Sequence, residues 1–268
     1  MIWSPNPDLY PRYLRPRILR GLGLGEKLEY KAWLKIREVG SKGFCGAVRG
    51  ILIERPYELF SNGETIFFYL TERRPNVIDI RENWPILDLA RTVEICSQLG
   101  VRHVHKGLYP WPFTIDALIT EQTANGIQYV AASIKTAEDA RDPDVRKRLT
   151  VEYLWCKENG IDWILIDTSG FTDSLHSTLR FMRRWYQNRY EPAEPKIAAF
   201  LAQFGHVYQR NVLLKELLET LSAHTKGDPC EVENLFTYCA WKGLVPISLK
   251  HPLRLDRPVV LTGVPANG

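Results

Sequence analysis

Residues 61–168 carry apolar patterns that predict alternating helices and strands. Apolar side chains recur with helical spacing in three segments, Glu64–Glu72, about Leu87–Leu99 and Asp142–Asn159. Strands are predicted around Val77–Ile80 and over Phe113–Thr120, Ile127–Lys135 and Ile161–Asp167. Because helices and strands alternate, we expect a mixed α/β sheet with helices on its faces.

Short sequence signals mark the ends of several of these elements. Ser61 stands three residues before Glu64, which is the spacing of a helix-capping box. Asn125 and Gly126 separate two predicted strands, and this dipeptide is a strong signal for a tight hairpin turn. Residues 161–167 form a nearly continuous apolar run, which predicts a buried strand.

Beyond Thr168 the pattern becomes mainly helical. Helices are predicted over Leu175–Tyr190, Pro195–Phe204, Val207–His224 and Glu231–Trp241. Two short apolar strands follow, Val245–Leu249 and Pro258–Leu261. Several helices followed by a small hairpin are the order of a winged-helix domain. We therefore expect one domain over residues 1–168 and a winged-helix-like domain over residues 169–268, with the boundary near residues 168–172.

Composition narrows the class of protein. Hydrophobic residues make up 45% of the chain and charged residues 25%, which is typical of globular proteins and argues against disorder. No apolar run approaches the length of a membrane span, and the N-terminus lacks the apolar core of a signal peptide, so we expect a cytoplasmic protein. Five scattered cysteines without CxxC spacing support neither a structural zinc site nor a disulfide framework.

Positive charge is concentrated near the N-terminus. Residues 1–60 hold eleven Lys or Arg against six Asp or Glu, while the whole chain has a net charge of +4. Tyrosines alternate there with four arginines, Arg12, Arg15, Arg17 and Arg20. Cations interleaved with rings suit a nucleic acid, so these arginines are candidate DNA-binding residues. Charge alone equally fits a solvated N-terminal arm.

The predicted hairpin brings together residues that can carry chemistry. Ser133 and Lys135 share one face of their strand, and hairpin pairing can place that face beside Asp116 on the partner strand. An Asp followed by a polar–x–Lys strand end is the core of the PD-(D/E)xK nuclease arrangement. Carboxylates there hold Mg²⁺, which activates water, and the lysine positions that water. Glu64 is available as a second acid. Alone, this spacing also fits a strand with charged edges.

Five blocks in this region occur in an order that resembles the TnsA family, the endonuclease subunit of heteromeric cut-and-paste bacterial transposases. The blocks are SNGETIFFYL, NVIDIRENWPILD, ICSQLGVRH, FTIDALIT and AASIKTAEDARD. YKAWLKIREVGSKG and VEYLWCKENGIDWILI resemble the family in order and spacing as well. The resemblance covers most of residues 20–168. Beyond residue 170 it rests on length and helix pattern only.

The resemblance implies roles for individual residues. Glu64 falls on the family's first catalytic acid, Asp116 on its central metal-binding aspartate and Lys135 on its catalytic lysine. Glu64 and Asp116 would hold Mg²⁺, with Mn²⁺ as a substitute. Ser133 is a departure, because the family commonly has Gln there and related nucleases an acid. Glu152 falls on a family acid that would contact Lys135 or a second metal.

The resemblance also implies a function and partners. The chain would be a Mg²⁺-dependent endonuclease with a restriction-endonuclease-like N-terminal domain, and it would cut the 5′-ended strands of transposon-end DNA. An RNase H-like, TnsB-like transposase subunit would cut and join the 3′ ends. A TnsC-like AAA+ regulator would be the second partner. One alternative is a free-standing restriction or repair nuclease. Another is a non-catalytic adaptor with a nuclease fold, which the Ser133 departure favours.

Overall fold

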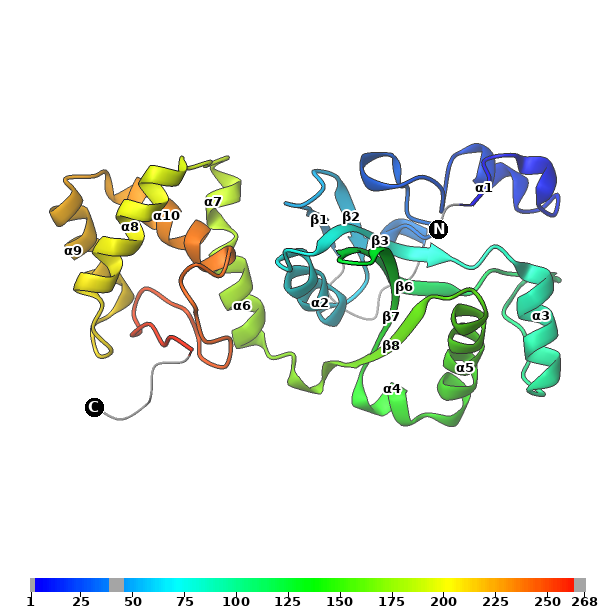
Figure 1. The fold of residues 1–268 in the computed structure, drawn as a ribbon. Coiled ribbons are helices and arrows are strands. Elements are labelled where there is room, and N and C mark those ends of the chain that lie inside the picture. Colours follow the sequence, from blue (N-terminus) through cyan, green and yellow to red (C-terminus); the bar gives the residue numbers. More distant parts are fainter. Residues whose placement is uncertain (1–2, 39–45, 263–268) are drawn as a thin grey trace. The chain divides into compact units, whose positions relative to one another are not determined.

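A computed structural model describes residues 3–38 and 46–262 of the chain. The chain divides into two compact units, Met1–Gly170 and Phe171–Gly268. Figure 1 draws both units. In the described residues, every helix is too short or too polar to cross a membrane.

The first unit is built on a four-stranded mixed sheet with the strand order β3–β6–β7–β8. The first three strands pair antiparallel and β8 pairs parallel to β7. These strands are β3 (Val77–Pro85), β6 (Thr114–Thr123), β7 (Gly126–Lys135) and β8 (Asp162–Asp167). Two small two-stranded sheets are separate from it in strand pairing, β1 (Gly46–Arg49) with β2 (Pro56–Leu59) and β4 (His105–Lys106) with β5 (Tyr109–Pro110).

Helices of the first unit flank this sheet. They are α1 (Arg15–Leu19), α2 (Asn62–Glu72), α3 (Leu89–Gln98), α4 (Ala137–Arg141) and α5 (Pro143–Glu158). Among the residues described in this unit there are also four 3₁₀ turns, η1 (Pro7–Leu9), η2 (Lys27–Glu29), η3 (Ile36–Glu38) and η4 (Thr168–Gly170). Helix α2 packs on β3 and β7, while α5 packs on β8 and α3. The predicted mixed α/β architecture of residues 61–168 is confirmed.

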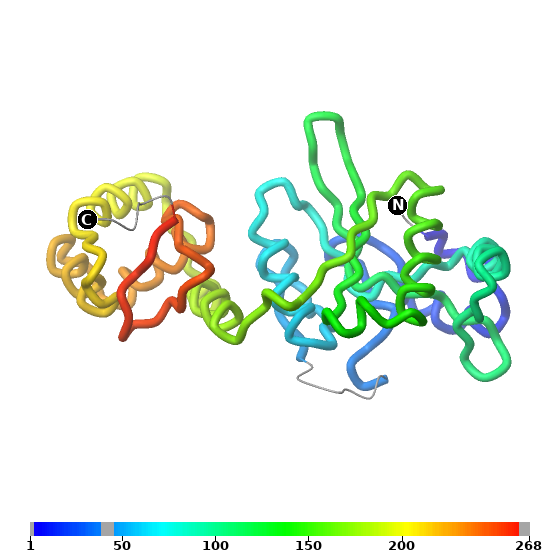
Figure 2. Tube along the Cα trace, turned by 90° about the horizontal axis from the view of Figure 1, so that it is seen from below, coloured from blue at the N-terminus to red at the C-terminus, as the bar shows by residue number. Residues whose placement is uncertain are grey.

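The hairpin of β6 and β7 is the central feature of the sheet. Thr123 pairs with Gly126 across the turn, and the register continues to the pair of Ala117 and Ala132. Gly126 has φ +108, a value that favours glycine. The turn itself lies at Ala124 and Asn125, one residue before the predicted Asn125-Gly126 position, and Gly126 is the first residue of the return strand. Figure 2 shows this hairpin projecting beyond the neighbouring strands.

Strand β8 differs from the prediction of a buried strand. It is an edge strand, and each of its residues is exposed or half-buried, with Ile164 36% and Leu165 39% exposed. An apolar run identifies a strand but does not say whether another layer covers both of its faces. The core lies instead between the sheet and the helices α3 and α5, around Trp84, Trp155 and Phe113.

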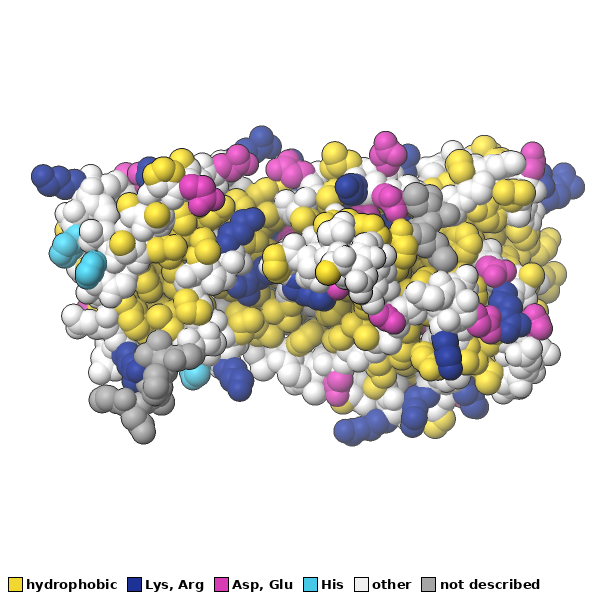
Figure 3. Space-filling view, in the orientation of Figure 1, with side chains coloured by type: hydrophobic (Ala, Val, Ile, Leu, Met, Phe, Trp, Pro, Cys, Tyr) yellow, Lys and Arg dark blue, Asp and Glu magenta, His cyan; other side chains and the backbone are white. Residues whose placement is uncertain are grey.

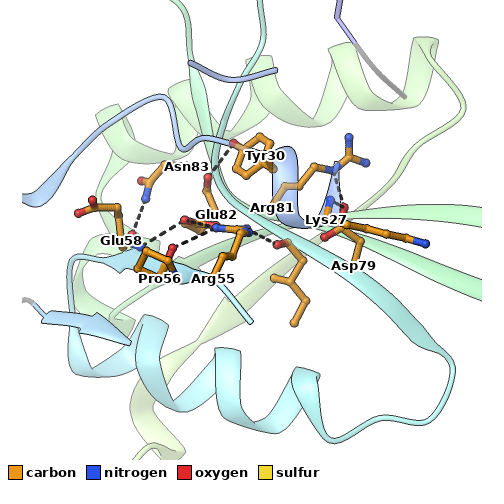
Figure 4. A network of polar contacts seen from close by, with 10 residues as sticks. Lys27, Tyr30, Arg55, Pro56, Glu58, Asp79, Arg81, Glu82 and Asn83 are labelled. Carbon is orange, nitrogen blue, oxygen red and sulfur yellow. Dashed lines mark hydrogen bonds and ion pairs between the residues drawn. The ribbon is translucent and has the colours of Figure 1, made fainter. Parts of the chain in front are cut away.

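A buried polar network joins β3 to the segments before it (Figure 4). The Arg55 guanidinium donates to both carboxylate oxygens of Glu82, at 2.8 and 2.6 Å, and to the carbonyl of Ile80. Tyr30 Oη donates to the carbonyl of Glu82 at 2.8 Å. Asp79 Oδ2 accepts from the backbone of Lys27 at 3.0 Å. These contacts hold β2 and η2 against the sheet and thereby fix the entry to α2.

The basic N-terminal segment is packed rather than a solvated arm. Leu14, Ile18 and Leu22, spaced four residues apart, are buried in a cluster with Trp33. Arg17 is 8% exposed and its Nη2 lies 2.9 Å from Glu38 Oε2. The helical spacing of these apolar residues indicates burial, although tyrosines and arginines stand between them in the sequence.

The second unit is helical. Its helices are α6 (Asp173–Met182), α7 (Arg184–Gln187), α8 (Glu194–Val207), α9 (Leu214–Thr225) and α10 (Pro229–Trp241). Helix α10 packs against the other four and carries the buried residues Leu235, Phe236 and Trp241. The predicted helices over 175–190 and 207–224 are wrong in extent, because Arg183 divides α6 from α7 and α9 begins only at Leu214.

The two strands predicted at the end of the chain are reduced to isolated bridges in the described residues. Ile247 bridges Leu261, and Pro258 bridges Leu213 at the start of α9. Pro246 and Pro258 lie beside these bridges and lack the backbone N–H that a longer ladder needs.

Candidate active site

Glu64 is held at the N-terminal end of α2 by a capping arrangement. Its backbone N–H donates to Ser61 Oγ at 3.1 Å, and its carboxylate accepts from the backbone of Phe60 at 2.9 Å. Ser61 Oγ also donates to Glu64 Oε1 at 3.1 Å. The bond from Glu64 N–H to Ser61 Oγ is the one that the capping-box spacing predicts, whereas the carboxylate accepts from Phe60 and not from the backbone of Ser61. Together these contacts fix the side chain of Glu64 and the start of the helix.

Asp116 and Lys135 meet across the β6–β7 hairpin. Ala117 pairs with Ala132, and Asp116 and Ser133 are the next residues along the antiparallel ladder, away from the turn. Side chains alternate along a strand, so Asp116, Ser133 and Lys135 face the same side of the sheet. Lys135 Nζ lies 2.6 Å from Asp116 Oδ2. The backbone N–H of Ile134 donates to the same oxygen at 2.6 Å. The strand period and the hairpin turn thus bring these residues together.

Glu152 reaches the same place from α5. Ser133 Oγ donates to Glu152 Oε2 at 2.6 Å, and both side chains are buried. Ser133, the residue that differs from the TnsA-family pattern, is therefore hydrogen-bonded to the acid on the neighbouring helix. Lys135, in turn, donates to Asp116.

Burial and mutual repulsion perturb the carboxyl groups of this cluster. Burial, aided by the negative charge of Asp116, raises the pKa of Glu64 to about 7. Burial also raises the pKa of Glu152 to about 7, again with a contribution from Asp116. Burial acts to lower the pKa of Lys135, but the charge and hydrogen bond of Asp116 outweigh it, so this pKa is raised. Lys135 therefore remains a cation at neutral pH.

The oxygen donors present suit a hard divalent cation. Glu64 and Asp116 offer carboxylate oxygens, and their repulsion would be relieved by a positive ion. Within residues 3–38 and 46–262, no group of three Asp, Glu, His or Cys side chains is arranged to hold a metal. Mg²⁺ commonly keeps several waters and takes only one or two protein carboxylates, so this donor set fits Mg²⁺.

The four arginines predicted to bind DNA lie in and around α1. Arg12 and Arg20 are exposed, while Arg15 lies 2.9 Å from Asp8. Arg17 is buried against Trp33 and paired with Glu38, so it stabilises the fold of this segment. Of the four, Arg12 and Arg20 present the most accessible charges.

Sequence reasoning missed one polar group of the cluster, the backbone N–H of Ile134. Its side chain is buried and apolar, and nothing in a side-chain pattern marks an amide that donates to a carboxylate. Its position between Ser133 and Lys135 was the only available indication.

Comparison with known proteins adds two findings. Residues 74–168 match the model of the family described as TnsA-like endonuclease N terminal. This range contains Asp116, Ser133, Lys135 and Glu152, and it begins after Glu64. The chain is also similar to the transposon Tn7 transposition protein TnsA of Escherichia coli, with 26% identity over 196 residues, 72% of this chain and 69% of that protein. The resemblance to the TnsA family is thereby confirmed, and the similarity to a TnsA-like endonuclease domain extends over residues 74–168.

Proposed function

From this relationship to TnsA, we propose that the chain is the Mg²⁺-dependent DNA endonuclease subunit of a heteromeric transposase. The observation that carries the proposal is the convergence of Glu64, Asp116 and Lys135 from α2, β6 and β7. Two acids and a lysine on adjacent strands and a helix are the arrangement of a PD-(D/E)xK nuclease. The domain over residues 1–168 is then the restriction-endonuclease-like part of the chain.

Each residue of the cluster has a distinct role in this proposal. Glu64 and Asp116 hold the Mg²⁺ ion, which when bound neutralises the scissile phosphate and lowers the pKa of the attacking water. Lys135 remains protonated beside Asp116, so it orients that water and offsets phosphate charge as a cation. Ile134 orients the Asp116 carboxylate through its amide. Ser133 and Glu152 act as positioning residues behind the strand end.

The proposed substrate is transposon-end DNA, cut on the 5′-ended strands. The similarity to a protein named as a transposition protein supports partners of the TnsB-like and TnsC-like kinds, an RNase H-like transposase and an AAA+ regulator. The mainly helical unit from Phe171, proposed as a winged-helix-like domain over residues 169–268, is the candidate docking part for such partners. A cytoplasmic location follows from that role.

The test is strand-specific cleavage of transposon-end DNA by the chain together with its partner subunits. Asp116→Ala removes a metal ligand and should abolish cleavage of the 5′-ended strands while the chain still folds. Asp144→Ala is the matched control, because its carboxylate is exposed on α5. Excess EDTA should also stop cleavage. Cutting that persists in EDTA, or in the Asp116 variant, contradicts the proposal.

The adaptor role is the second candidate. Ser133 favours it, because its hydroxyl is joined to Glu152 and so adds no acidic ligand to the cluster. If the chain is an adaptor, its Asp116→Ala variant should support transposition as well as the wild type does. A free-standing nuclease, by contrast, would cut DNA without partner subunits. The cleavage assay, run with and without partners, identifies a free-standing nuclease, and transposition by the Asp116→Ala variant identifies an adaptor.

A further inference from the structure

A polar and aromatic pocket lies in the first unit, and none of the residues of the acid–lysine cluster lines it. Its volume is about 360 Å³. It is formed where α1 meets the small sheet of β4 and β5. Its lining residues are Tyr13, Arg17, Arg20, Lys106, Tyr109 and Trp111 together with Pro16. The space-filling view shows Lys and Arg side chains among hydrophobic ones on the drawn face of this unit (Figure 3).

Aromatic rings provide flat surfaces in this pocket. Tyr13 and Tyr109 are stacked, with ring centroids 4.6 Å apart and planes inclined by 23°. Tyr109 is nevertheless 55% exposed, so part of its ring remains accessible. Trp111 packs against Trp33 at 5.7 Å between centroids, which fixes its ring in place. A ring that its neighbours already hold in place loses little conformational entropy when another ring stacks on it.

Cations surround these rings. Lys106 Nζ lies 4.6 Å from the centre of the Trp111 ring, and the Arg17 guanidinium lies 5.6 Å from it. Arg20 is exposed and its Nε donates to the carbonyl of Pro16 at 3.2 Å, which holds its head group near the helix. None of the seven lining residues is acidic. The buried Arg17 Nε has no hydrogen-bond partner among the residues that the structure describes.

We propose that this pocket binds an unpaired nucleotide of DNA, with its base on the Tyr109 face and its phosphate on Lys106 and Arg20. The inference rests on the proposed function, since it assigns part of the same DNA substrate to a second site. Duplex DNA hides the faces of its bases, so accessible aromatic rings beside cations favour a single strand over a duplex. Cations alone would serve either form.

The chain itself limits how far this pocket lies from the proposed cleavage site. Trp111 precedes Asp116 by five residues, and β5 leads through them into β6. Five residues span at most about 18 Å between their Cα atoms. A B-DNA strand advances about 3.4 Å per nucleotide, so this limit corresponds to about five nucleotides. If one DNA strand contacts both sites, the unpaired nucleotide in the pocket therefore lies within about five nucleotides of the cut.

The test measures binding of fluorescein-labelled (dT)12 in EDTA, so that neither metal binding nor cleavage contributes. The double variant Lys106→Ala/Tyr109→Ala removes one exposed cation and one exposed ring. We expect its Kd for (dT)12 to rise at least about fivefold, the effect of one lost base–aromatic contact. Its log Kd should also depend less steeply on log salt, by about 0.7 for one lost phosphate contact.

Matched variants separate this role from damage to the fold. Tyr153→Ala/Lys157→Ala removes the same two residue types from an exposed Lys–Tyr pair on α5 and should bind like the wild type. Lys106→Arg/Tyr109→Phe keeps the charge and the ring and should also retain affinity. Arg20→Ala leaves the rings untouched and should lower both affinity and salt dependence.

Three results would overturn the inference. The first is wild-type affinity for (dT)12 in the Lys106→Ala/Tyr109→Ala variant. The second is a loss of affinity in that variant that is as large for a twelve-base-pair duplex as for (dT)12. The third is an equally large loss of (dT)12 affinity in the Tyr153→Ala/Lys157→Ala control. Cleavage in Mg²⁺ is measured separately with the wild type. Loss of (dT)12 binding in a chain that proves unable to cut DNA would support the pocket and refute the nuclease, so the two proposals fail independently.

Discussion

Lys135 Nζ and the backbone N–H of Ile134 both lie 2.6 Å from a single oxygen, Oδ2 of Asp116. The lysine thus serves as the counter-ion of this carboxylate in the structure. A divalent cation that binds Asp116 competes with Lys135 for the same negative charge. The lysine is therefore expected to weaken metal binding somewhat while it promotes the reaction, and these two effects can be measured separately.

Lys135→Ala should separate metal binding from cleavage. It removes the competing cation, so the affinity for Mn²⁺, measured by calorimetry without DNA, should be equal to or tighter than that of the wild type. It also removes a positioned catalytic group, so the rate of DNA cleavage should fall about 10²-fold or more. Lys147→Ala, an exposed lysine on α5, is the control. A cleavage rate within tenfold of the wild type would exclude Lys135 from the reaction.

The same variant should change the products of transposition in cells. If the chain cuts only the 5′-ended strands, a partner subunit can still join the 3′ ends when Lys135 is replaced. The donor then stays attached through its uncut strands, and simple insertions should give way to cointegrates after replication. Sequencing of the products decides this point. Persistence of simple insertions would show that another nuclease cuts these strands, as the adaptor role requires, and loss of all insertions would show that Lys135 is needed for the structure of the transposase as well.

Glu152 should make the fold less stable as the pH rises toward neutral. Its pKa is about 7 in the folded chain and 4.5 ordinarily, so between these values the folded state binds more protons than the unfolded state. The free energy of unfolding therefore decreases with pH in this window, by at most about 1.4 kcal/mol per pH unit for one group. Glu152→Gln mimics the protonated form and should reduce that slope.

Urea unfolding at pH 5 and pH 8 in metal-free buffer measures this effect. Glu158→Gln is the matched control on the same helix, because its carboxylate is exposed and paired with Arg91. Some slope should remain in the Glu152→Gln variant, because the pKa of Glu64 is raised in the same way. An unchanged slope in Glu152→Gln would mean that this carboxyl group ionises normally in the folded chain.

The sequence predicted the meeting of Asp116 and Lys135 because two local rules were sufficient. Residues two apart on a strand share a face, and the hairpin turn, which lies within one residue of the Asn125-Gly126 signal, sets the register of the hairpin. The bond between Ser133 and Glu152 was outside the reach of such rules. It depends on how α5 packs on the sheet, and the residues that determine this packing lie far apart in the chain.

Two errors have the same origin. The apolar run of β8 predicted a buried strand, although its exposure depends on its place at the sheet edge. The N-terminal segment suggested a solvated arm, although Leu14 and Ile18 are buried beneath residues as distant as Leu87. In both cases residue types were interpreted correctly in their local context, and a long-range contact decided the burial.

The buried pair of Arg55 and Glu82 gives the last prediction. Both side chains are at most 7% exposed, and burial raises the pKa of Glu82 while Arg55 opposes that rise. Arg55→Ala leaves the Glu82 carboxylate buried without its cation and should destabilise the first unit by about 3–5 kcal/mol. Replacing both residues, as Arg55→Met with Glu82→Leu, should restore much of that loss, because the penalty comes from the unpaired charge.

Hydrogen exchange at the amides of β3 and β6 is the suitable measurement, since it reports on the first unit alone. Arg49→Ala, which breaks an exposed pair with Glu54, is the control and should change stability by less than about 1 kcal/mol. Equal protection in the Arg55 variant and in this control would show that the Glu82 carboxyl group is protonated or solvated in the folded chain. The network of Figure 4 would then contribute little to holding β2 and η2 against the sheet.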